Sequence, residues 1–142
     1  MTTGDGARGA HTRIPEEAYD LFDGPNFAHL ATVMADGAPH VTPMWQERQG
    51  DQRVLLNTNR GRTKARNLQR DPRVALSIRD QQDPFRYVQV RGRASLREEG
   101  ALEDVNRLSE KYVGGPYRPL MEGEVRVAVL VDVEHVYYRP RR

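Results

Sequence analysis

The sequence contains no cysteine. This absence excludes a disulfide framework, a thiolate metal site and a cysteine nucleophile, and nothing in the chain favours an oxidising compartment. Long hydrophobic runs are also missing, since the longest, such as residues 127–131, fall far short of the roughly 20 residues that cross a bilayer. Residues 1–9 lack the apolar stretch of a signal peptide. We therefore expect a soluble, cytoplasmic protein with no membrane partner.

The chain also lacks a marked excess of either positive or negative charge. The 22 basic residues are offset by 20 acidic residues spread along the chain, which leaves a net charge of +2. A face that binds nucleic acid would need clustered basic residues with exposed aromatic residues between them, and the aromatic residues here lie mainly in apolar strand segments. We therefore expect no nucleic-acid partner. Only two of the basic residues are lysines, Lys64 and Lys111.

Metal and hydrolase motifs are missing too. The four histidines, His11, His29, His40 and His135, never form a close pair, so we expect no metal site. No serine lies in a G-x-S-x-G turn, which gives no sign of a hydrolase. The glycine pattern at residues 4–9 resembles a dinucleotide fingerprint, but no strand precedes it, so we reject that interpretation.

The length of 142 residues predicts one domain, because a single hydrophobic core serves a chain of this size. We expect that domain to cover residues 14–138. The polar, glycine-rich residues 1–13 and the charged residues 139–142 are predicted to be flexible.

Six segments have the pattern of strands. Asp36 and Gly37 give a strong hairpin signal between the first two, and alternate valines from Val125 to Val133 mark the last. The six predicted strands cover residues 27–34, 40–47, 53–57, 73–79, 85–96 and 125–133. Helix signals predict three short helices, at about residues 15–23, 61–70 and 101–112. Strands that are mostly linked by hairpins, with few helices, favour a closed antiparallel barrel with helices at its periphery.

Residues 57–68 carry the clearest functional signal. Here a strand is predicted to run through Thr58 and a glycine into a helix whose first turn holds Arg62 and Lys64. Free backbone N–H groups and the helix dipole favour an anion at such a junction, and the side chains of Arg62, Lys64 and Thr58 or Thr63 can add donors. The alternative is a solvated basic helix face, which Arg66 and Arg70 fit better than Arg62 and Lys64 do.

Several segments together resemble the pyridoxamine-phosphate-oxidase-like split-barrel family, and more narrowly its branch that uses coenzyme F420, a deazaflavin. The resemblance covers about residues 14–138, and its most specific element is Arg62-x-Lys64-x-x-Asn67-Leu68 before Asp71-Pro72. The other matching segments are residues 27–33, 36–37, 39–45, 57–58 and 87–92.

This resemblance implies a mainly β fold, a six-stranded antiparallel split β-barrel of the FMN-binding type with short peripheral helices. It also implies a homodimer whose sites lie at the interface and a cytoplasmic oxidoreductase that transfers a hydride from reduced F420 to a small unsaturated substrate. The cofactor-binding residues that it implies are Pro39, His40, Val41, Thr42 and Pro43 along the ring, Thr58, Arg62 and Lys64 at the phosphate, and Tyr87 from the partner chain. No catalytic residue stands out.

Two alternatives remain open at this stage. FMN carries the same ribityl phosphate arm and a similar tricyclic ring, so the chain could be an FMN-binding flavin oxidoreductase. A protein that binds F420 or FMN with little catalysis of its own is the other alternative. Oxidation of pyridoxamine phosphate itself is disfavoured, because the oxidases that act on it are longer and need further basic residues for a second phosphate.

Overall fold

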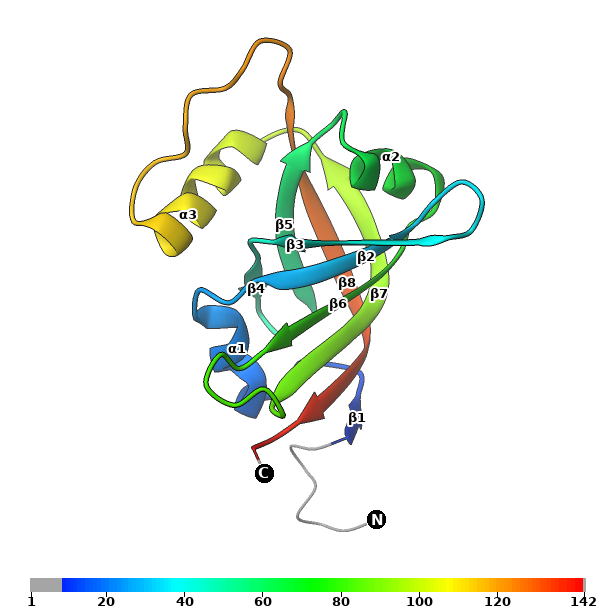
Figure 1. Cartoon of the computed structure of the whole chain (residues 1–142), viewed down its shortest axis with the longest axis vertical. Coiled ribbons are helices and arrows are strands. Elements are labelled where there is room, and N and C mark those ends of the chain that lie inside the picture. The colour runs from blue at the N-terminus through cyan, green and yellow to red at the C-terminus, as the bar shows by residue number, and fades with distance from the viewer. Residues whose placement is uncertain (1–8, 142) are drawn as a thin grey trace.

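An antiparallel sheet forms most of the molecule (Figure 1). The computed structural model describes residues 9–141. The strands are β1 (Gly9–His11), β2 (Ala28–Val33), β3 (Pro39–Met44), β4 (Glu47–Gln49), β5 (Arg53–Asn59), β6 (Arg73–Arg79), β7 (Tyr87–Arg97) and β8 (Arg126–Arg139). Their order in the sheet is β3-β2-β6-β7-β8-β5-β4, and β1 pairs with β8. The predicted mainly β, antiparallel fold is confirmed.

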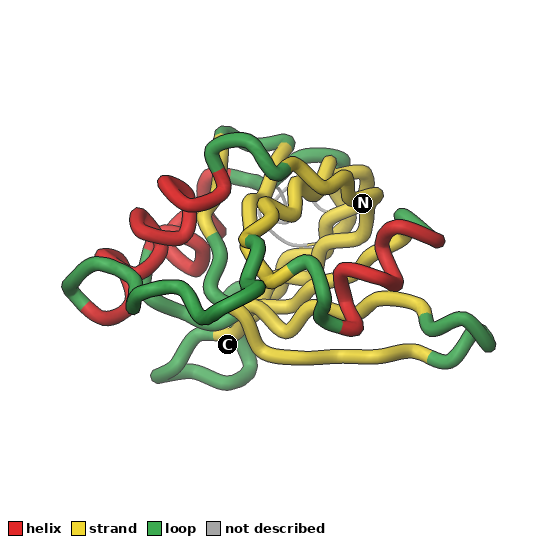
Figure 2. The backbone as a smooth tube through the Cα atoms, turned by 90° about the horizontal axis from the view of Figure 1, so that it is seen from above, coloured by secondary structure: helices red, strands yellow, loops and turns green. Residues whose placement is uncertain are grey.

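The sheet curls because of how its two end strands are connected. β3 and β4 lie at opposite ends of the strand order, yet only Trp45 and Gln46 separate them in the sequence. The strands must therefore wrap around until the two ends meet at this corner, and Figure 2 shows them wrapped around a common centre with the helices outside. The result is a curled half-barrel of the split-barrel type.

The core lies inside the curl and is built by alternation along each strand. In β6, for example, Val74, Leu76 and Ile78 are buried, whereas Arg73 and Arg79 are exposed. This period of two is what a strand with one face in the core requires. Inward-facing core residues of the other strands include Leu30, Val54, Leu56, Val88, Val90, Val129 and Val131.

A bulge between β7 and β8 changes which side chains of β8 point inward. The register shifts between Arg91 and Gly92. Before the bulge the buried residues of β8 include Val129 and Val131, and after it they are Val136 and Tyr138, so the buried positions change from odd to even residue numbers. A Cβ atom at Gly92 would lie 1.9 Å from the backbone oxygen of Asp132, so only glycine fits here. The alternation of valines predicted the first half of β8 and could not predict this change of phase.

Within residues 9–141 four helical segments surround the sheet: a 3-10 turn, η2 (Glu16–Ala18), and the helices α1 (Tyr19–Asp23), α2 (Thr63–Arg70) and α3 (Ala101–Val113). α2 lies at the end of β5, and α3 covers the outer face of β5 and β8 (Figure 1). Leu108 of α3 packs with Leu55 and Ala128 in a small second hydrophobic cluster. As a result β5 and the first part of β8, residues 127–131, are shielded on both faces, which fixes the position of α3. None of the helices within residues 9–141 has the length and apolarity needed to span a bilayer.

The strand count differs from the prediction of six, because the described part of the chain contains eight strands. The two additional strands, β1 and β4, have three residues each and no periodicity that could reveal them. β4 arises because the predicted strand at residues 40–47 breaks at Trp45 and Gln46. β1 lies within the segment 1–13 that was predicted to be flexible, and residues 1–8 lie outside the described part of the chain. At the other end, Arg139 belongs to β8 and Arg141 pairs with Asp80 at 3.0 Å, so order extends past residue 138.

Candidate functional site

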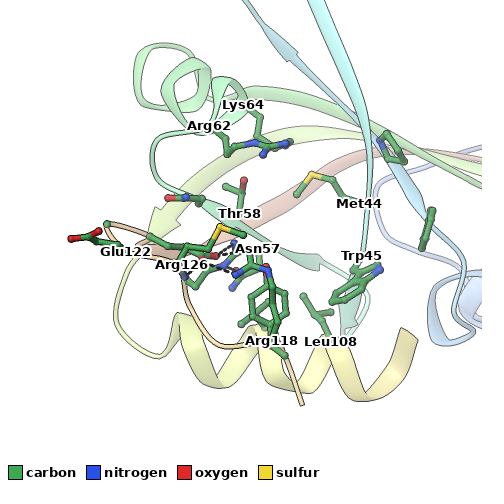
Figure 3. Close-up of a pocket in the computed structure, with 18 residues that line it drawn as sticks. Met44, Trp45, Asn57, Thr58, Arg62, Lys64, Leu108, Arg118, Glu122 and Arg126 are labelled. Carbon is green, nitrogen blue, oxygen red and sulfur yellow. Dashed lines mark hydrogen bonds and ion pairs between the residues drawn. The ribbon is translucent and has the colours of Figure 1, made fainter. Parts of the chain in front are cut away.

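A cavity of about 550 Å³ lies between the start of α2, the end of β5, the helix α3 and the loop that joins α3 to β8. Figure 3 shows its two ends: Arg62 and Lys64 project from α2 on one side, and Leu108 of α3 lies on the other. A volume of this size suits a small-molecule ligand. The cavity therefore brings the segment singled out in the sequence together with residues from three other elements.

The start of α2 presents free backbone donors. Arg62 is the N-cap residue, with extended backbone angles and no side-chain hydrogen bond to the first turn. The first N–H groups of a helix have no partner within the helix, so here they have no partner from the cap either. Together with the helix dipole these groups favour an anion, and α2 carries no acidic residue in its first turn to compensate them.

Lys64 is the most informative side chain of the cavity. The residue is only 7% exposed, and within residues 9–141 its ammonium group donates no hydrogen bond and pairs with no carboxylate. Burial, with a further contribution from the charges of Arg62 and Arg126, holds the pKa of Lys64 below its usual value. A cation that is largely shielded from water and has no counter-ion favours an anion in the cavity.

Two further donors belong to this end of the cavity. Thr58, near the end of β5, is 4% exposed and lines the cavity, and Arg62 lines it from an exposed position. A hydroxyl, a guanidinium, an ammonium and the backbone N–H groups of one helix turn form a set of donors of the kind that holds a phosphate. Arg66 and Arg70, by contrast, are exposed and do not line the cavity.

Arg126, at the start of β8, lines the cavity from the opposite side. Its Nε donates to Oδ1 of Asn57 at 2.9 Å, and its Nη1 donates to Oε2 of Glu124 at 2.8 Å. Asn57 in turn donates from Nδ2 to the carbonyl oxygen of Ala101 at 2.9 Å. Through these bonds Arg126 is fixed to β5, to α3 and to the loop before β8.

The loop before β8 is held by an ion-pair cluster. Arg118 contacts Glu124 through both amino groups, at 2.7 and 3.1 Å, and the backbone N–H of Met121 donates to the same carboxylate at 2.8 Å. The hydrogen bond from Arg118 is the main reason that the pKa of Glu124 falls to about 2. The ring of Tyr117 lies near both guanidinium groups, 4.7 Å from that of Arg118 and 5.0 Å from that of Arg126. The loop is thereby held next to the cavity.

The remaining wall is apolar and aromatic. Trp45 stacks on Tyr112 with ring centroids 5.4 Å apart and an angle of 7°, and Tyr117 approaches Trp45 edge-on at 6.3 Å. Leu108 and Phe27 complete this wall, and Phe27 is 50% exposed. The cavity thus has a cationic side at α2 and an apolar side at Trp45 and Leu108.

The structure separates the predicted cofactor-binding residues into two groups. Thr58, Arg62, Lys64 and Pro43 line the cavity. The remaining predicted residues, Pro39, His40, Val41, Thr42 and Tyr87, do not line it.

These remaining residues lie on the two faces of the sheet. His40 and Thr42 are paired with buried residues of β2 and face the interior side, where Nδ1 of His40 and Oγ1 of Thr42 have no hydrogen-bond partner among the described residues. Pro39 and Val41 face outward. Tyr87 lies on this same outward face, three strands away along the sheet order, and its ring contacts Tyr137 at 6.1 Å.

Sequence reasoning missed the residues on the far side of the cavity, namely Arg118, Glu124 and Arg126. Arg126 stands between alternate valines of a predicted strand, and that pattern gives no sign of a site. The one available signal was the concentration of charged residues between the Gly114-Gly115-Pro116 stop and the final strand. It could not indicate which face of the fold this loop covers.

Comparison with solved structures places the fold and the site in context. An F420 reductase is 31% identical in sequence, with a TM-score of 0.78, over 87% of this chain and 98% of that chain. The conserved hypothetical protein Rv2991 from Mycobacterium tuberculosis is 29% identical over 92% of this chain and 88% of that chain, with a TM-score of 0.71. The flavocytochrome Anf3 from Azotobacter vinelandii shares the fold, with 21% identity and a TM-score of 0.67 over 98% of this chain and 72% of that chain.

The family model described as pyridoxamine 5'-phosphate oxidase matches residues 14–139, nearly the whole chain. The match includes every strand from β2 to β8 and the cationic start of α2. The chain therefore belongs to the pyridoxamine 5'-phosphate oxidase family, whose split-barrel members bind flavin-type cofactors.

Proposed function

We propose that this protein is an oxidoreductase that uses reduced coenzyme F420 to transfer a hydride to a small unsaturated organic substrate. The observation that carries the proposal is Lys64, a buried cation without a counter-ion, which faces a cavity at the start of a helix. The similarity to an F420 reductase at 31% identity favours the deazaflavin over other ligands that carry a phosphate.

In this proposal the phosphate of the cofactor lies against Lys64, Arg62, Thr58 and the first N–H groups of α2. Lys64 supplies a buried point charge, Arg62 an exposed fork of donors and Thr58 a hydroxyl. When it is bound, the deazaflavin supplies the hydride chemistry. The chain's own residues bind and orient the cofactor, and the apolar wall around Trp45 reduces access of water to that side of the cavity.

The ring of the cofactor is proposed to lie along β3, beside residues 39–43. β3 is at the edge of the sheet and pairs only with β2 among the described residues, so one side of its backbone has donors and acceptors without sheet partners. Pro43 connects this strand to the cavity, because it lines the cavity from the end of β3.

We also propose a homodimer with a site at each end of the interface. Val41 is 61% exposed on the outward face of β3, and Tyr87 lies on the same face of the sheet beyond the reach of the cavity in its own chain. A second copy packed on this face would cover Val41 and place its own Tyr87 beside the ring. The protein is proposed to be cytoplasmic, as expected for an enzyme of this cofactor.

FMN is the second candidate, because the donors at α2 suit its phosphate equally well. In that case the protein is a flavin oxidoreductase, or a carrier of FMN or F420 with little activity of its own. Titration of ligand-free protein with F420 and with FMN, followed by the fluorescence of each cofactor, separates these candidates. Tight binding of F420 with negligible binding of FMN is expected, and the reverse result would reject F420 as the cofactor.

Replacement of Lys64 by alanine tests the phosphate site itself. We expect cofactor affinity to fall by about 1–3 kcal/mol, the value of a charge-assisted hydrogen bond. Arg66→Ala is the matched control, since Arg66 lies on the same helix but is exposed and outside the cavity. Unchanged affinity in the Lys64 variant would remove this residue from the site.

A further inference from the structure

We propose that the half of the cavity away from α2 is a subsite for a planar, unsaturated carboxylic acid. Arg126 holds the carboxylate, and the wall of Trp45 and Leu108 contacts the conjugated part. The inference rests on the proposed function in one respect only, since it assigns the α2 half of the cavity to the cofactor. It adds the chemical class of the second ligand.

The first argument is the charge that remains at Arg126. Its side chain is 10% exposed. Glu124 is the nearest carboxylate, but Arg118 already holds it through two hydrogen bonds, so one carboxylate is shared by two guanidinium groups. A cation that is buried and only partly neutralised favours an additional anion.

The second argument is the set of donors that Arg126 has left. Nε is used by Asn57 and Nη1 by Glu124, while no described residue accepts a hydrogen bond from Nη2. Because Arg126 lines the cavity, this free amino group is accessible to a ligand. A guanidinium held at two of its three nitrogens is preorganised, so a ligand carboxylate would bind without the loss of side-chain freedom that an exposed arginine incurs.

The third argument is the shape and polarity of the facing wall. The ring of Trp45 is held in plane against Tyr112, at an angle of 7°, and Leu108 is 1% exposed beside it. Figure 3 shows Trp45 and Leu108 on one side of the cavity and Arg126 on the other, with Thr58 between them and α2. A flat apolar group fits against such a wall better than a bulky one, because aromatic side chains favour planar contacts.

The two ends of the cavity differ in the way that two ligands would require. The α2 end has an unpaired lysine and helix N–H groups, which suit a phosphate. The Arg126 end has one partly neutralised guanidinium next to aromatic rings, which suits the single charge of a carboxylate on a conjugated group. The cavity volume of about 550 Å³ lies within the range of small-molecule sites, and different residues line its two ends.

The test uses trans-cinnamate as the planar acid. Trans-cinnamamide has the same shape without the charge, and 3-cyclohexylpropanoate has the charge without the planar group. Isothermal titration of wild-type protein measures all three affinities. Trp45 is the only tryptophan of the chain, so its emission, excited at the red edge, reports whether a ligand reaches this wall. We expect cinnamate to bind at least about tenfold more tightly than either comparison compound and to change the emission of Trp45.

Variants assign the two contacts separately. Arg126→Gln is expected to remove the preference for cinnamate over cinnamamide while leaving the affinity for cinnamamide unchanged. Arg107→Gln is the matched control, because this arginine on α3 also contacts a carboxylate, Glu47 at 2.7 Å, but does not line the cavity. If Arg126→Gln does not fold, Trp45→Leu tests the same subsite, and we expect it to weaken both planar compounds about equally.

Three outcomes would overturn the proposal. Equal affinity of the acid and the amide would exclude Arg126 as a carboxylate ligand, and binding that leaves the emission of Trp45 unchanged would place the ligand elsewhere. Loss of cinnamate binding in Lys64→Ala, with Arg126→Gln unaffected, would place the acid in the phosphate site. The cofactor titration is independent: protein that binds cinnamate as described but neither F420 nor FMN would contradict the proposed function and leave this subsite intact.

Discussion

Two buried cationic side chains of this protein, those of Arg86 and Lys64, differ in the partners that surround them. Arg86 and Lys64 are 5% and 7% exposed, respectively. Arg86 donates to Asp20 at 2.7 and 2.9 Å, to Asp80 at 3.2 Å and to the hydroxyl of Tyr138 at 3.0 Å. Lys64 has no such partner within residues 9–141.

The difference separates a charge that the fold itself neutralises from one that the fold leaves without a counter-ion. Hydrogen bonding to Asp20 raises the pKa of Arg86, whereas burial lowers the pKa of Lys64. A buried charge with its own counter-ions holds elements together, here α1, the turn after β6 and the end of β8. A buried charge without them destabilises the ligand-free fold and gains its partner only when an anion binds.

The largest effect is expected at Arg86. Arg86→Met leaves the carboxylate of Asp80 and the hydroxyl of Tyr138 without this partner, and we expect a loss of stability of about 3–5 kcal/mol. Urea denaturation measures it. Arg86→Lys, which keeps the charge but not the fork, is expected to recover only part of the loss. A loss below about 1 kcal/mol in Arg86→Met would contradict the structural role.

The next effect concerns Lys64, where the stability of the ligand-free protein and the affinity for the cofactor are expected to respond differently. Lys64→Met removes an unpaired buried charge but keeps most of the apolar side chain, so we expect ligand-free protein to be as stable as wild type or more stable. Cofactor affinity is expected to fall by about 1–3 kcal/mol in the same variant. Thermal unfolding and cofactor titration give the two numbers. A clear loss of stability without ligand would show that Lys64 has a structural partner instead.

A third effect is the dependence of binding on pH. Burial holds the pKa of Lys64 below 10.5 in the folded, ligand-free protein. Burial of the charged form therefore destabilises the fold at pH values below the folded pKa, and this penalty is lost progressively as pH rises from the folded pKa to the unfolded value. An anion prefers the charged form, so cofactor affinity is expected to fall over the same alkaline range, before an ordinary lysine would titrate. Lys64→Arg, which keeps its charge there, is expected to show no such fall, and titrations between neutral and alkaline pH compare the two.

The smallest effect is expected at Arg66. Its side chain is exposed on α2 and does not line the cavity. Arg66→Gln should change both stability and cofactor affinity by less than about 0.5 kcal/mol. A larger loss of affinity would mean that the phosphate site extends along the outer face of α2, and the contrast between paired and unpaired charges would no longer account for binding.

The parts of this fold that sequence could predict are those with a local signal. Alternation predicted β6 and the first half of β8, and the glycine and cations of residues 57–68 predicted the strand-to-helix junction at α2, because each of these signals lies within a single turn or strand. Arg126 could not be predicted in the same way. Its role depends on a partner in β5, a carboxylate in a loop and the position of α3, which are set by tertiary packing.

The five predicted cofactor-binding residues that lie outside the cavity have the same explanation. Val41 and Tyr87 share one face of the sheet only because of the strand order, which local patterns do not encode. Whether a second copy brings Tyr87 to the site depends on that face rather than on any motif. The bulge at Gly92 also escaped prediction, since a lone glycine in a strand does not reveal which backbone approaches it.

The position of β8 in the sheet affects how this chain can fold during synthesis. β8 follows every other strand in the sequence, yet it lies between β7 and β5 and also pairs with β1. Until β8 leaves the ribosome, β5 and β7 therefore have exposed edges, and the two halves of the sheet are not joined by a strand. Contacts between distant segments are slow to form, so the nascent chain passes through a stage in which two unpaired edges are open to association. Closure of the sheet and completion of the cavity wall at Arg126 then occur in the same step.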